Sequence, residues 1–277
     1  MKKTIISLLV LLQVLIIQAA GPDYTLTLDA TNLKMLEVDC GAGYLNIIGD
    51  PNATGITVSA NIEMENVRGK DVKSIFDKYG ELKLFKQGRK AVLIAKFNQD
   101  ISFIKRLFMD FKNVRINLDV IVPADLALDI DDGSGDITIR RVNGEVTIDD
   151  GSGDLMIADI HANLNIDDGS GSTNISNIVG DVNIDDGSGA LIIKNVIGDV
   201  LVDDGSGLIT IRKVTGNVRV DDGSGNMDID SVGANVIVKD GSGNMSFSNV
   251  QGNVTILESG SGTETFDNIG GEVIRKD

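Results

Sequence analysis

The sequence has few of the residues that build cross-linked or reactive sites. Its 277 residues include one cysteine (Cys40), one histidine (His161) and no tryptophan. A single cysteine cannot form an internal disulfide, so stability has to come from a packed core. We interpret Cys40 as a small buried side chain, because a reactive thiol needs neighbouring cations and none is evident. No nucleophile pattern lies near His161, so we interpret it as a surface residue rather than a general base.

Positive charge is also scarce. The chain carries 25 lysines and arginines against 41 aspartates and glutamates, which gives a formal net charge of −16. A surface of this sign repels the phosphate backbone, so the composition disfavours a nucleic-acid partner.

Only one long apolar run occurs, from Ile5 to Ile17, and it is too short for a comfortable membrane span. It follows Lys2 and Lys3 and is followed by Ala19 and Ala20, which is the order of a secretory signal peptide. We therefore predict a signal peptide over residues 1–20 and an exported protein, located in the periplasm, on the cell surface or outside the cell. A retained N-terminal anchor is the alternative, and the lack of a cysteine after the run argues against a lipoprotein.

The dominant feature of the chain is a repeated tetrapeptide, Asp-Gly-Ser-Gly. It occurs seven times at a strict spacing of eighteen residues, and the first glycines of the copies are Gly133, Gly151, Gly169, Gly187, Gly205, Gly223 and Gly241. A short fixed period is typical of a solenoid, in which each repeat forms one coil.

Five apolar positions accompany each copy. In the first repeat they are Ile137, Ile139, Val142, Val146 and Ile148, and alternation with polar residues predicts two short strands. Two such strands cannot bury a face alone, but coils stacked at about 4.8 Å can. We predict an all-β fold: a single-stranded parallel β-solenoid (β-helix) with 18-residue coils and irregular terminal caps. Thr173 is the one polar residue in these apolar columns.

A left-handed hexapeptide helix also has coils of eighteen residues, but it needs an aliphatic residue at every sixth position. Val142 and Ile148 satisfy this rule, whereas the next position is Asp154. The hexapeptide architecture is therefore excluded.

Two turns are expected in each coil. Gly-Ser-Gly is one, and the other contains a glycine two residues after the middle apolar position (Gly144, Gly180, Gly198, Gly216 and Gly252). We expect this second glycine to have positive φ. Where Ala162 and Ala234 replace it, the adjacent Asn163 or Gly233 is expected to take the left-handed conformation.

The pattern divides the chain into a signal peptide (1–20), N-terminal degenerate coils and a cap (21–129), and a regular solenoid with a C-terminal cap (130–277). Leu36 to Ile48 mimics a repeat and predicts a degenerate coil, while Asp71 to Tyr79 predicts a short helix. Ile101 to Val114 is expected to cover the N-terminal end of the solenoid, with an amphipathic binding segment as the alternative. Near the C-terminus, Glu258 to Gly262 contains one extra residue, which brings Glu264 close to an inward position and predicts an atypical last coil.

Three features together resemble a known family. They are the segment Val122-Pro123-Ala124 before the first repeat, the run of Gly-Ser-Gly-Asp-like turns, and the Val-x-Gly-x-Val linker of several coils. They resemble the bacterial envelope β-solenoid domains called "putative adhesins", including the head-GIN type, over Leu36 to Val273. The resemblance implies a β-solenoid fold and an adhesin-like role. Such domains usually carry serine or threonine where this chain carries paired aspartates.

The paired aspartates form two predicted columns. The first members are Asp131, Asp149, Asp167, Asp185, Asp203 and Asp221, with Lys239 next; the second members are Asp132, Asp150, Asp168, Asp186, Asp204, Asp222 and Asp240. Alternation from the apolar positions directs the first column outward and the second inward or into the turn.

Carboxylates stacked at about 4.8 Å repel one another by about 1 kcal/mol per pair even in water. Three effects could offset this repulsion: hydrogen bonds from the turn with screening by salt, coordination of calcium, or protonation of some inward aspartates. We expect the second column to be bonded to the turn, and divalent cations remain a possible partner.

The sequence shows no catalytic constellation, so it predicts no catalytic or cofactor-binding residues and leaves metal ligands open. We predict a non-enzymatic exported β-solenoid, adhesin-like or a cell-envelope binding or scaffold protein, whose partner is an envelope or extracellular protein or glycan. The alternatives are a polysaccharide-acting β-helix enzyme and a calcium-binding structural solenoid. A carboxylate cluster in a groove beside Arg or Lys would favour the enzyme, and a smooth surface would favour the binder.

Overall fold

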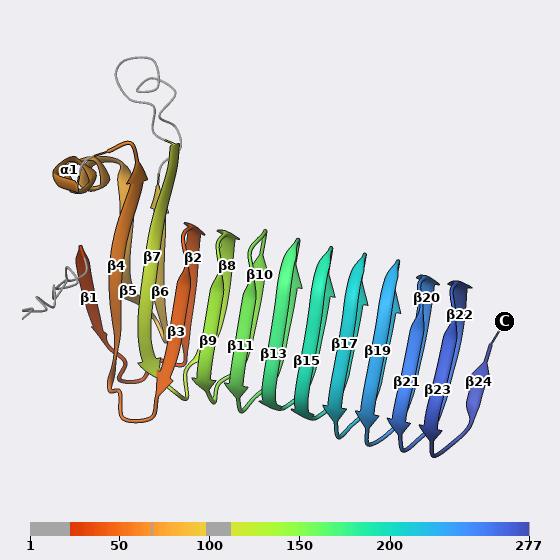
Figure 1. The fold of residues 1–277 in the computed structure, drawn as a ribbon. Coiled ribbons are helices and arrows are strands. Elements are labelled where there is room, and N and C mark those ends of the chain that lie inside the picture. The colour runs from red at the N-terminus through yellow and green to blue at the C-terminus, as the bar shows by residue number, and fades with distance from the viewer. Residues whose placement is uncertain (1–22, 68, 98–111, 277) are drawn as a thin grey trace, which may run out of the picture.

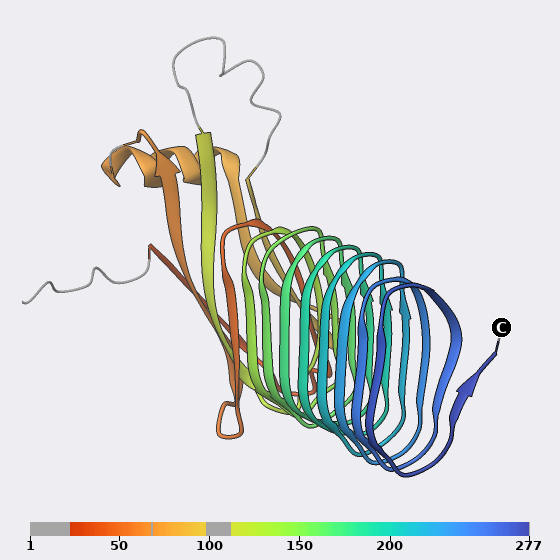
Figure 2. The same ribbon diagram turned by 45° about the vertical axis from the view of Figure 1, so that its right-hand side comes forward.

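The protein is a β-solenoid of flattened coils stacked along one axis, as the computed structural model shows in two views (Figures 1 and 2). The structure describes residues 23–67, 69–97 and 112–276. The predicted signal peptide and most of the predicted cap at 101–114 lie outside these residues. The one helix of the described residues is too short to cross a membrane.

Two twelve-stranded sheets, here called sheet A and sheet B, form the flat sides of the coils. Sheet A contains, in spatial order, β1 (Tyr24–Asp29), β4 (Gly55–Glu65), β7 (Lys112–Pro123), β3 (Leu45–Asp50), β9 (Ile137–Val142), β11 (Leu155–Ile160), β13 (Gly171–Val179), β15 (Gly189–Ile197), β17 (Gly207–Val214), β19 (Gly225–Val232), β21 (Met245–Val250) and β23 (Glu264–Ile269). Sheet B contains, from the opposite end, β24 (Val273–Arg275), β22 (Val254–Ser261), β20 (Val236–Ser242), β18 (Val218–Asp222), β16 (Val200–Asp204), β14 (Val182–Asp186), β12 (Leu164–Asp168), β10 (Val146–Asp150), β8 (Ala127–Ser134), β2 (Met35–Ala42), β6 (Lys90–Phe97) and β5 (Gly80–Gln87).

The regular coils stack in parallel with a register of eighteen residues, which confirms the predicted fold. Val146 of β10, for example, pairs with Leu164 of β12, and Ile137 of β9 pairs with Leu155 of β11. The five apolar positions of each regular coil are buried and form one continuous aliphatic core. Thr173 occupies its place in that core and is fully buried.

The second turn differs from the expectation. The left-handed residue is not the glycine but the residue just before the middle apolar position, in every regular coil: Arg141 (φ 60), Asp159 (φ 58), Asn177 (φ 60), Asn195 (φ 58), Lys213 (φ 59), Ser231 (φ 62), Asn249 (φ 53) and Asn268 (φ 53). This residue adds one position to the strand, so that Ile139 and Val142 both face inward although they are three residues apart.

The glycine column of that turn has a different cause. A Cβ on Gly144 would lie 2.4 Å from the carbonyl oxygen of Leu126, and one on Gly216 would lie 2.4 Å from that of Gly198. The expected positive φ is confirmed at Gly180 and Gly198 (φ 151 and 158), but it is not found at Gly144, Gly216 or Gly252. The glycines therefore allow close approach between coils, and the predicted shift of a left-handed residue to Asn163 or Gly233 was wrong.

Two degenerate coils precede the regular ones. The predicted coil at Leu36 to Ile48 is confirmed: β2 and β3 pair in register with β8 and β9, for example Leu45 with Ile137. On its other side, β6 and β7 pair in parallel with β2 and β3 and form a second coil.

Antiparallel strands and a helix extend the sheets beyond this second coil. β4 and β1 continue sheet A, and β5 continues sheet B. Helix α1 (Gly69–Tyr79) confirms the predicted helix. Its Phe76 is buried, with ring centroids 5.3 Å from Tyr24 and 6.4 Å from Phe97. Phe76 belongs to the buried core, and Tyr24 and Phe97 pack against it.

The C-terminal coil is irregular, as predicted. The pairing of β20 with β22 shifts by one residue after Val238, and Glu264 then stands opposite Met245. The Glu264 carboxylate accepts a hydrogen bond from Arg275 Nη2 at 2.6 Å, and the Arg275 guanidinium lies 5.3 Å from the Phe266 ring centroid. An ion pair thus stands at the last coil, where earlier coils place aliphatic side chains.

We predict that Gly207→Ala lowers the free energy of unfolding by about 1–3 kcal/mol. Its Cβ would lie 1.7 Å from the carbonyl oxygen of Gly189, so adjacent coils would have to separate. Gly133→Ala is the control, because it also replaces a glycine of the repeated tetrapeptide, in the first copy, but its Cβ would lie 3.8 Å from the nearest atom. Equilibrium denaturation compares the two variants, and equal losses would contradict this account.

Candidate functional site

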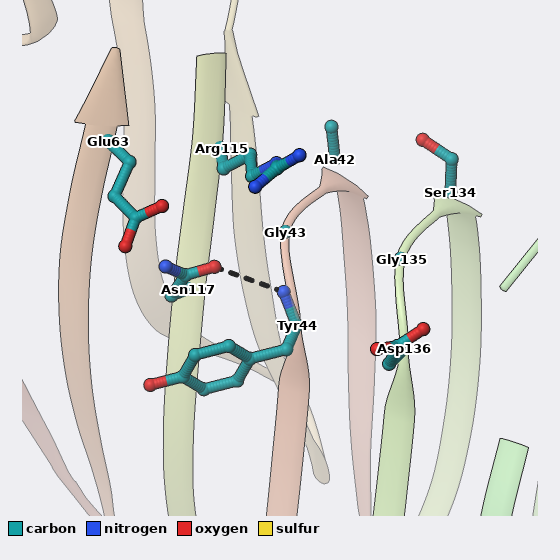
Figure 3. Close-up of a pocket in the computed structure, with 9 residues that line it drawn as sticks. All are labelled: Ala42, Gly43, Tyr44, Glu63, Arg115, Asn117, Ser134, Gly135 and Asp136. Carbon is teal, nitrogen blue, oxygen red and sulfur yellow. Dashed lines mark hydrogen bonds between the residues drawn. The ribbon is translucent and has the colours of Figure 1, made fainter. Parts of the chain in front are cut away.

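A polar pocket of about 520 Å³ lies at one corner of the solenoid, near its N-terminal end (Figure 3). The pocket is lined by Ala42, Gly43, Tyr44, Glu63, Arg115, Asn117, Ser134, Gly135 and Asp136. These residues come from the Gly-Ser-Gly-type turns of two successive coils and from the neighbouring strands β4 and β7.

The pocket exists because β7 extends beyond the coil that it joins (Figure 1). β3 pairs with β7 only from Leu118 onward, whereas β4 pairs with β7 as far as Lys112. The first half of β7 therefore has a strand on one side and a turn on the other. That turn packs tightly, since a Cβ on Gly43 (φ 133) would lie 2.3 Å from the carbonyl oxygen of Ile116.

Hydrogen bonds hold the aromatic side of the pocket. The buried Asn117 accepts a hydrogen bond from the Tyr44 backbone N–H at 3.2 Å. The Tyr44 hydroxyl donates to Asp119 Oδ2 at 3.2 Å, and Asn46 Nδ2 donates to Asp119 Oδ1 at 2.9 Å. Desolvation and the adjacent Asp119 carboxylate raise the pKa of Tyr44, so the phenol is neutral. Its side chain is fixed in place yet 40% exposed.

Both signs of charge stand around this tyrosine. Glu63 and Arg115 are cross-strand partners on β4 and β7, and Arg115 extends toward the turn at Ala42 and Gly43 (Figure 3). Asp136 Oδ1 accepts a hydrogen bond from the backbone N–H of Asp154 in the next coil at 3.2 Å. The pocket can thus offer an aromatic face, an amide, a cation and carboxylates to a ligand.

Sequence reasoning did not identify this pocket. Tyr44 stands at the turn position that Asp136 and Asp154 occupy in the following coils, and this substitution was the one local signal. Arg115 and Asn117 lie more than seventy residues away in sequence, and only the pairing of β3 with β7 brings them to Tyr44.

The two aspartate columns face as the alternation predicts. The first members are exposed or half-buried, whereas the second members, here called the inner aspartates, are at most 3% exposed. In six coils the inner carboxylate accepts the backbone N–H of the turn serine two residues on: Asp150 at 3.2 Å, Asp168 at 3.0 Å, Asp186 at 3.0 Å, Asp204 at 3.0 Å, Asp222 at 2.9 Å and Asp240 at 3.1 Å. The predicted bond to the turn is confirmed in these coils.

The other oxygen of the inner carboxylates is less well satisfied. Asp168 Oδ2 accepts a hydrogen bond from the Thr173 hydroxyl at 3.0 Å, which explains the polar residue in the core. Within the described part of the chain, Oδ2 of Asp132, Asp150, Asp186, Asp204 and Asp222 is buried without a partner. Burial is the main cause that raises the pKa of Asp150 to about 7 and that of Asp132, Asp186, Asp204 and Asp222 to about 6.

The first members of the aspartate pairs, from Asp131 to Asp221, are here called the outer aspartates, and lysines stand near both ends of their column. Lys96 pairs with Asp39, and Lys239 Nζ lies 3.4 Å from Asp221 Oδ2 and 4.0 Å from Glu258 Oε2. Among the described residues, no group of three or more acidic, histidine or cysteine side chains is placed to hold a metal ion. The outer aspartates instead stand in single file, one per coil.

A further polar column was missed by the sequence reasoning. At the second turn, a side-chain amide or carboxylate oxygen accepts the backbone N–H of the corresponding residue one coil later. The bonds run from Asp181 to Asn163 (3.0 Å), Asp199 to Asp181 (2.9 Å), Asn217 to Asp199 (2.6 Å), Asn235 to Asn217 (3.2 Å) and Asn253 to Asn235 (2.9 Å). The signal was present as Asn or Asp at one fixed position in consecutive repeats.

His161 and Cys40 lie where the sequence analysis placed them. His161 is exposed, and its Nδ1 lies 3.1 Å from Asn143 Oδ1. Cys40 is buried opposite Asp132, and burial raises the pKa of its thiol.

Among known proteins, this chain is similar only to solved structures in the comparisons made. No protein-family model and no curated protein sequence matches the chain. A putative cell adhesion protein from Clostridium sporogenes shows 12% identity, covers 88% of this chain and 97% of its own, and has a TM-score of 0.27. A putative adhesin from Bacteroides fragilis shows 10% identity, and the match covers 92% of this chain and 98% of the adhesin, with a TM-score of 0.34. A putative adhesin from Parabacteroides merdae shows 12% identity, and the match covers 91% of this chain and 95% of the adhesin, with a TM-score of 0.26.

The last two structures are called putative adhesins, as are the domains that the sequence resembles. At these identities and TM-scores the similarity does not extend to function.

We predict that calcium leaves the melting temperature unchanged within about 1 °C at matched ionic strength, because the described acidic groups offer a cation too few converging ligands. Thermal melts of the full chain in millimolar calcium, in chelator, and in sodium chloride of equal ionic strength measure this. A saturable rise of many degrees that the chelator reverses would instead establish the calcium-binding solenoid.

Proposed function

We propose that the protein is an exported, non-enzymatic, adhesin-like binding protein that holds a glycan in the pocket at Tyr44. The observation that carries the proposal is the pocket itself, which combines an ordered and exposed tyrosine ring with amide, guanidinium and carboxylate groups. Its aromatic face is held in place by hydrogen bonds to β7, so a ligand would meet an ordered surface.

The lining suits a ligand rich in hydroxyl groups. The exposed Tyr44 ring offers an apolar face for the C–H groups of a sugar, and its hydroxyl is anchored at one edge. Glu63 and Asp136 supply acceptors and Arg115 supplies donors around that face, which is the mixture that sugar hydroxyls require.

The same residues keep a second function in view. Glu63 and Asp136 form a pair of carboxylates in a pocket with Arg115, the arrangement that would favour a polysaccharide-acting enzyme. However, Asp136 already accepts a backbone hydrogen bond from the next coil, and Glu63 is exposed to solvent. Neither carboxylate has the burial that typically makes a general acid, so binding is the better supported function.

Screening the full chain against an array of defined oligosaccharides, followed by calorimetry on the best binder, tests the proposal. We expect Tyr44→Ala to weaken binding at least tenfold, about 1.4 kcal/mol, because it removes the ring that stacks on the sugar. Phe85→Ala is the matched control, since Phe85 is also 40% exposed but lies on β5 of the other sheet.

Three results would count against the proposal. An equal loss of affinity in both variants would mean that the glycan binds elsewhere. If no member of the array bound, the proposal of a glycan ligand would be refuted. Release of shorter oligosaccharides that Glu63→Gln abolishes would establish the enzyme. Mass spectrometry of the protein recovered outside the cytoplasm tests export, with an expected mature chain that lacks residues 1–20.

A further inference from the structure

The inner aspartates are an unusual use of a solenoid core. Each stands in sheet B directly beside its counterparts in the neighbouring coils, as Asp150 stands between Asp132 and Asp168. One oxygen of each carboxylate from Asp150 to Asp240 is tied to the turn, but in Asp150, Asp186, Asp204 and Asp222 the second oxygen is buried without a partner within the described residues. A buried carboxylate oxygen with no donor is costly while it carries charge.

The charged groups around the inner aspartates are also acidic. Neighbouring inner aspartates, the outer aspartates of the same coils, and turn residues such as Asp136 and Asp154 all disfavour their ionisation. The lysines that reach this part of sheet B, Lys96 and Lys239, pair with outer acids. From sheet A, the side chains five residues after each inner aspartate are aliphatic, except for Thr173.

Thr173 shows what the other coils lack. Its hydroxyl donates to Asp168 Oδ2 and counteracts the effect of burial on the pKa of Asp168. The equivalent positions beside Asp132, Asp150, Asp186, Asp204 and Asp222 hold Ile137, Leu155, Leu191, Ile209 and Met227, none of which has a donor. One coil is thus built for a charged inner aspartate and five are not, although at Asp132 the adjacent Cys40 thiol partly offsets the effect of burial on the pKa.

A metal cation is a poor remedy for these five coils. Calcium takes six to eight oxygen ligands, whereas two successive inner carboxylates in an aliphatic core supply too few. A proton needs only one oxygen, and it removes both the charge and the repulsion along the column.

We propose that the inner column is a proton-binding site: in mildly acidic solution the folded solenoid takes up protons from solvent on Oδ2 of Asp132, Asp150, Asp186, Asp204 and Asp222, while Asp168, bonded to Thr173, holds its charge to lower pH. Each uptake joins one proton to one carboxylate and gives a neutral carboxylic acid.

The pH dependence of stability follows from the direction of these shifts. The folded-state pKa values of about 6 to 7 lie above the value of about 3.9 for unfolded aspartate. The folded chain therefore binds more protons than the unfolded chain, by about four near pH 5. This contribution is complete below the unfolded pKa and is lost as pH rises through the folded pKa values, so the solenoid loses stability between pH 5 and pH 8.

Thermal melts and proton-uptake calorimetry of the full chain between pH 5 and pH 8 test the proposal. We expect a melting temperature at least about 5 °C higher at pH 5 than at pH 8. Because general charge repulsion also weakens in acid, the decisive comparison is Asp204→Asn against Asp203→Asn. Both remove one charge from the same coil, but only Asp204→Asn should raise the melting temperature at pH 8 and reduce the proton uptake by about one.

A second pair of variants moves the donor instead of the acid. Ile209→Thr places a hydroxyl beside Asp204 at the same five-residue spacing as Thr173 beside Asp168, and Ile209→Val controls for the lost volume. We expect less proton uptake with Ile209→Thr than with Ile209→Val, and more with Thr173→Val than with the parent chain. Val and Thr have similar shapes, so packing alone would not separate each pair.

Two outcomes would overturn the proposal. One is an equal pH response in Asp204→Asn and Asp203→Asn. The other is a rise in melting temperature at pH 8 when sodium, potassium or calcium chloride is added at matched ionic strength. If Asp204→Asn abolished this rise and Asp203→Asn kept it, a metal cation would occupy the column.

Discussion

Every feature of this protein depends on the stacking of each coil on the one before it, in register and about 4.8 Å away. At that distance, like residues become neighbours whether or not they attract. Aliphatic columns gain from this, because Val and Ile at one position pack on Val and Ile at the next. The turns can stack only if their backbones approach closely, and a side chain would prevent this. At Gly207, for example, a Cβ would lie 1.7 Å from a carbonyl oxygen of the preceding coil, so the position requires glycine.

Polar columns face the same constraint and resolve it in different ways. Asn and Asp at the second turn accept a backbone N–H from the next coil, so stacking supplies each with a donor. The outer aspartates remain in contact with solvent, where water and salt weaken their repulsion. The inner aspartates have neither remedy for their second oxygen, and burial turns a tolerable repulsion into a raised pKa. Only Asp168 has a local answer, the Thr173 hydroxyl.

The regular coils could be predicted because two periods, two residues and eighteen, together decide which side chains face inward. They identified the five apolar columns and the opposite directions of Asp149 and Asp150. Local conformation was less accessible: the left-handed position holds Asn in four of its eight occurrences, but residues such as Arg141 and Lys213 occupy it elsewhere, so residue type does not mark it in every coil. The Thr173 bond and the Tyr44 pocket escaped because they depend on contacts between strands, not on a pattern along one strand.

The pocket and the inner aspartates show how a repeat protein separates function from support. Identical coils give an identical surface, so a unique site can form only where the repeat fails. Here it fails at the two degenerate coils, where β7 of one extends past the turn between β2 and β3 of the other, and Tyr44 in that turn replaces the turn aspartate. The inner aspartates, in contrast, recur because the coils do, and their effect accumulates with the number of coils. Ligand binding should therefore depend on a few residues at one end of the solenoid, whereas a change of pH should alter the stability of its whole length.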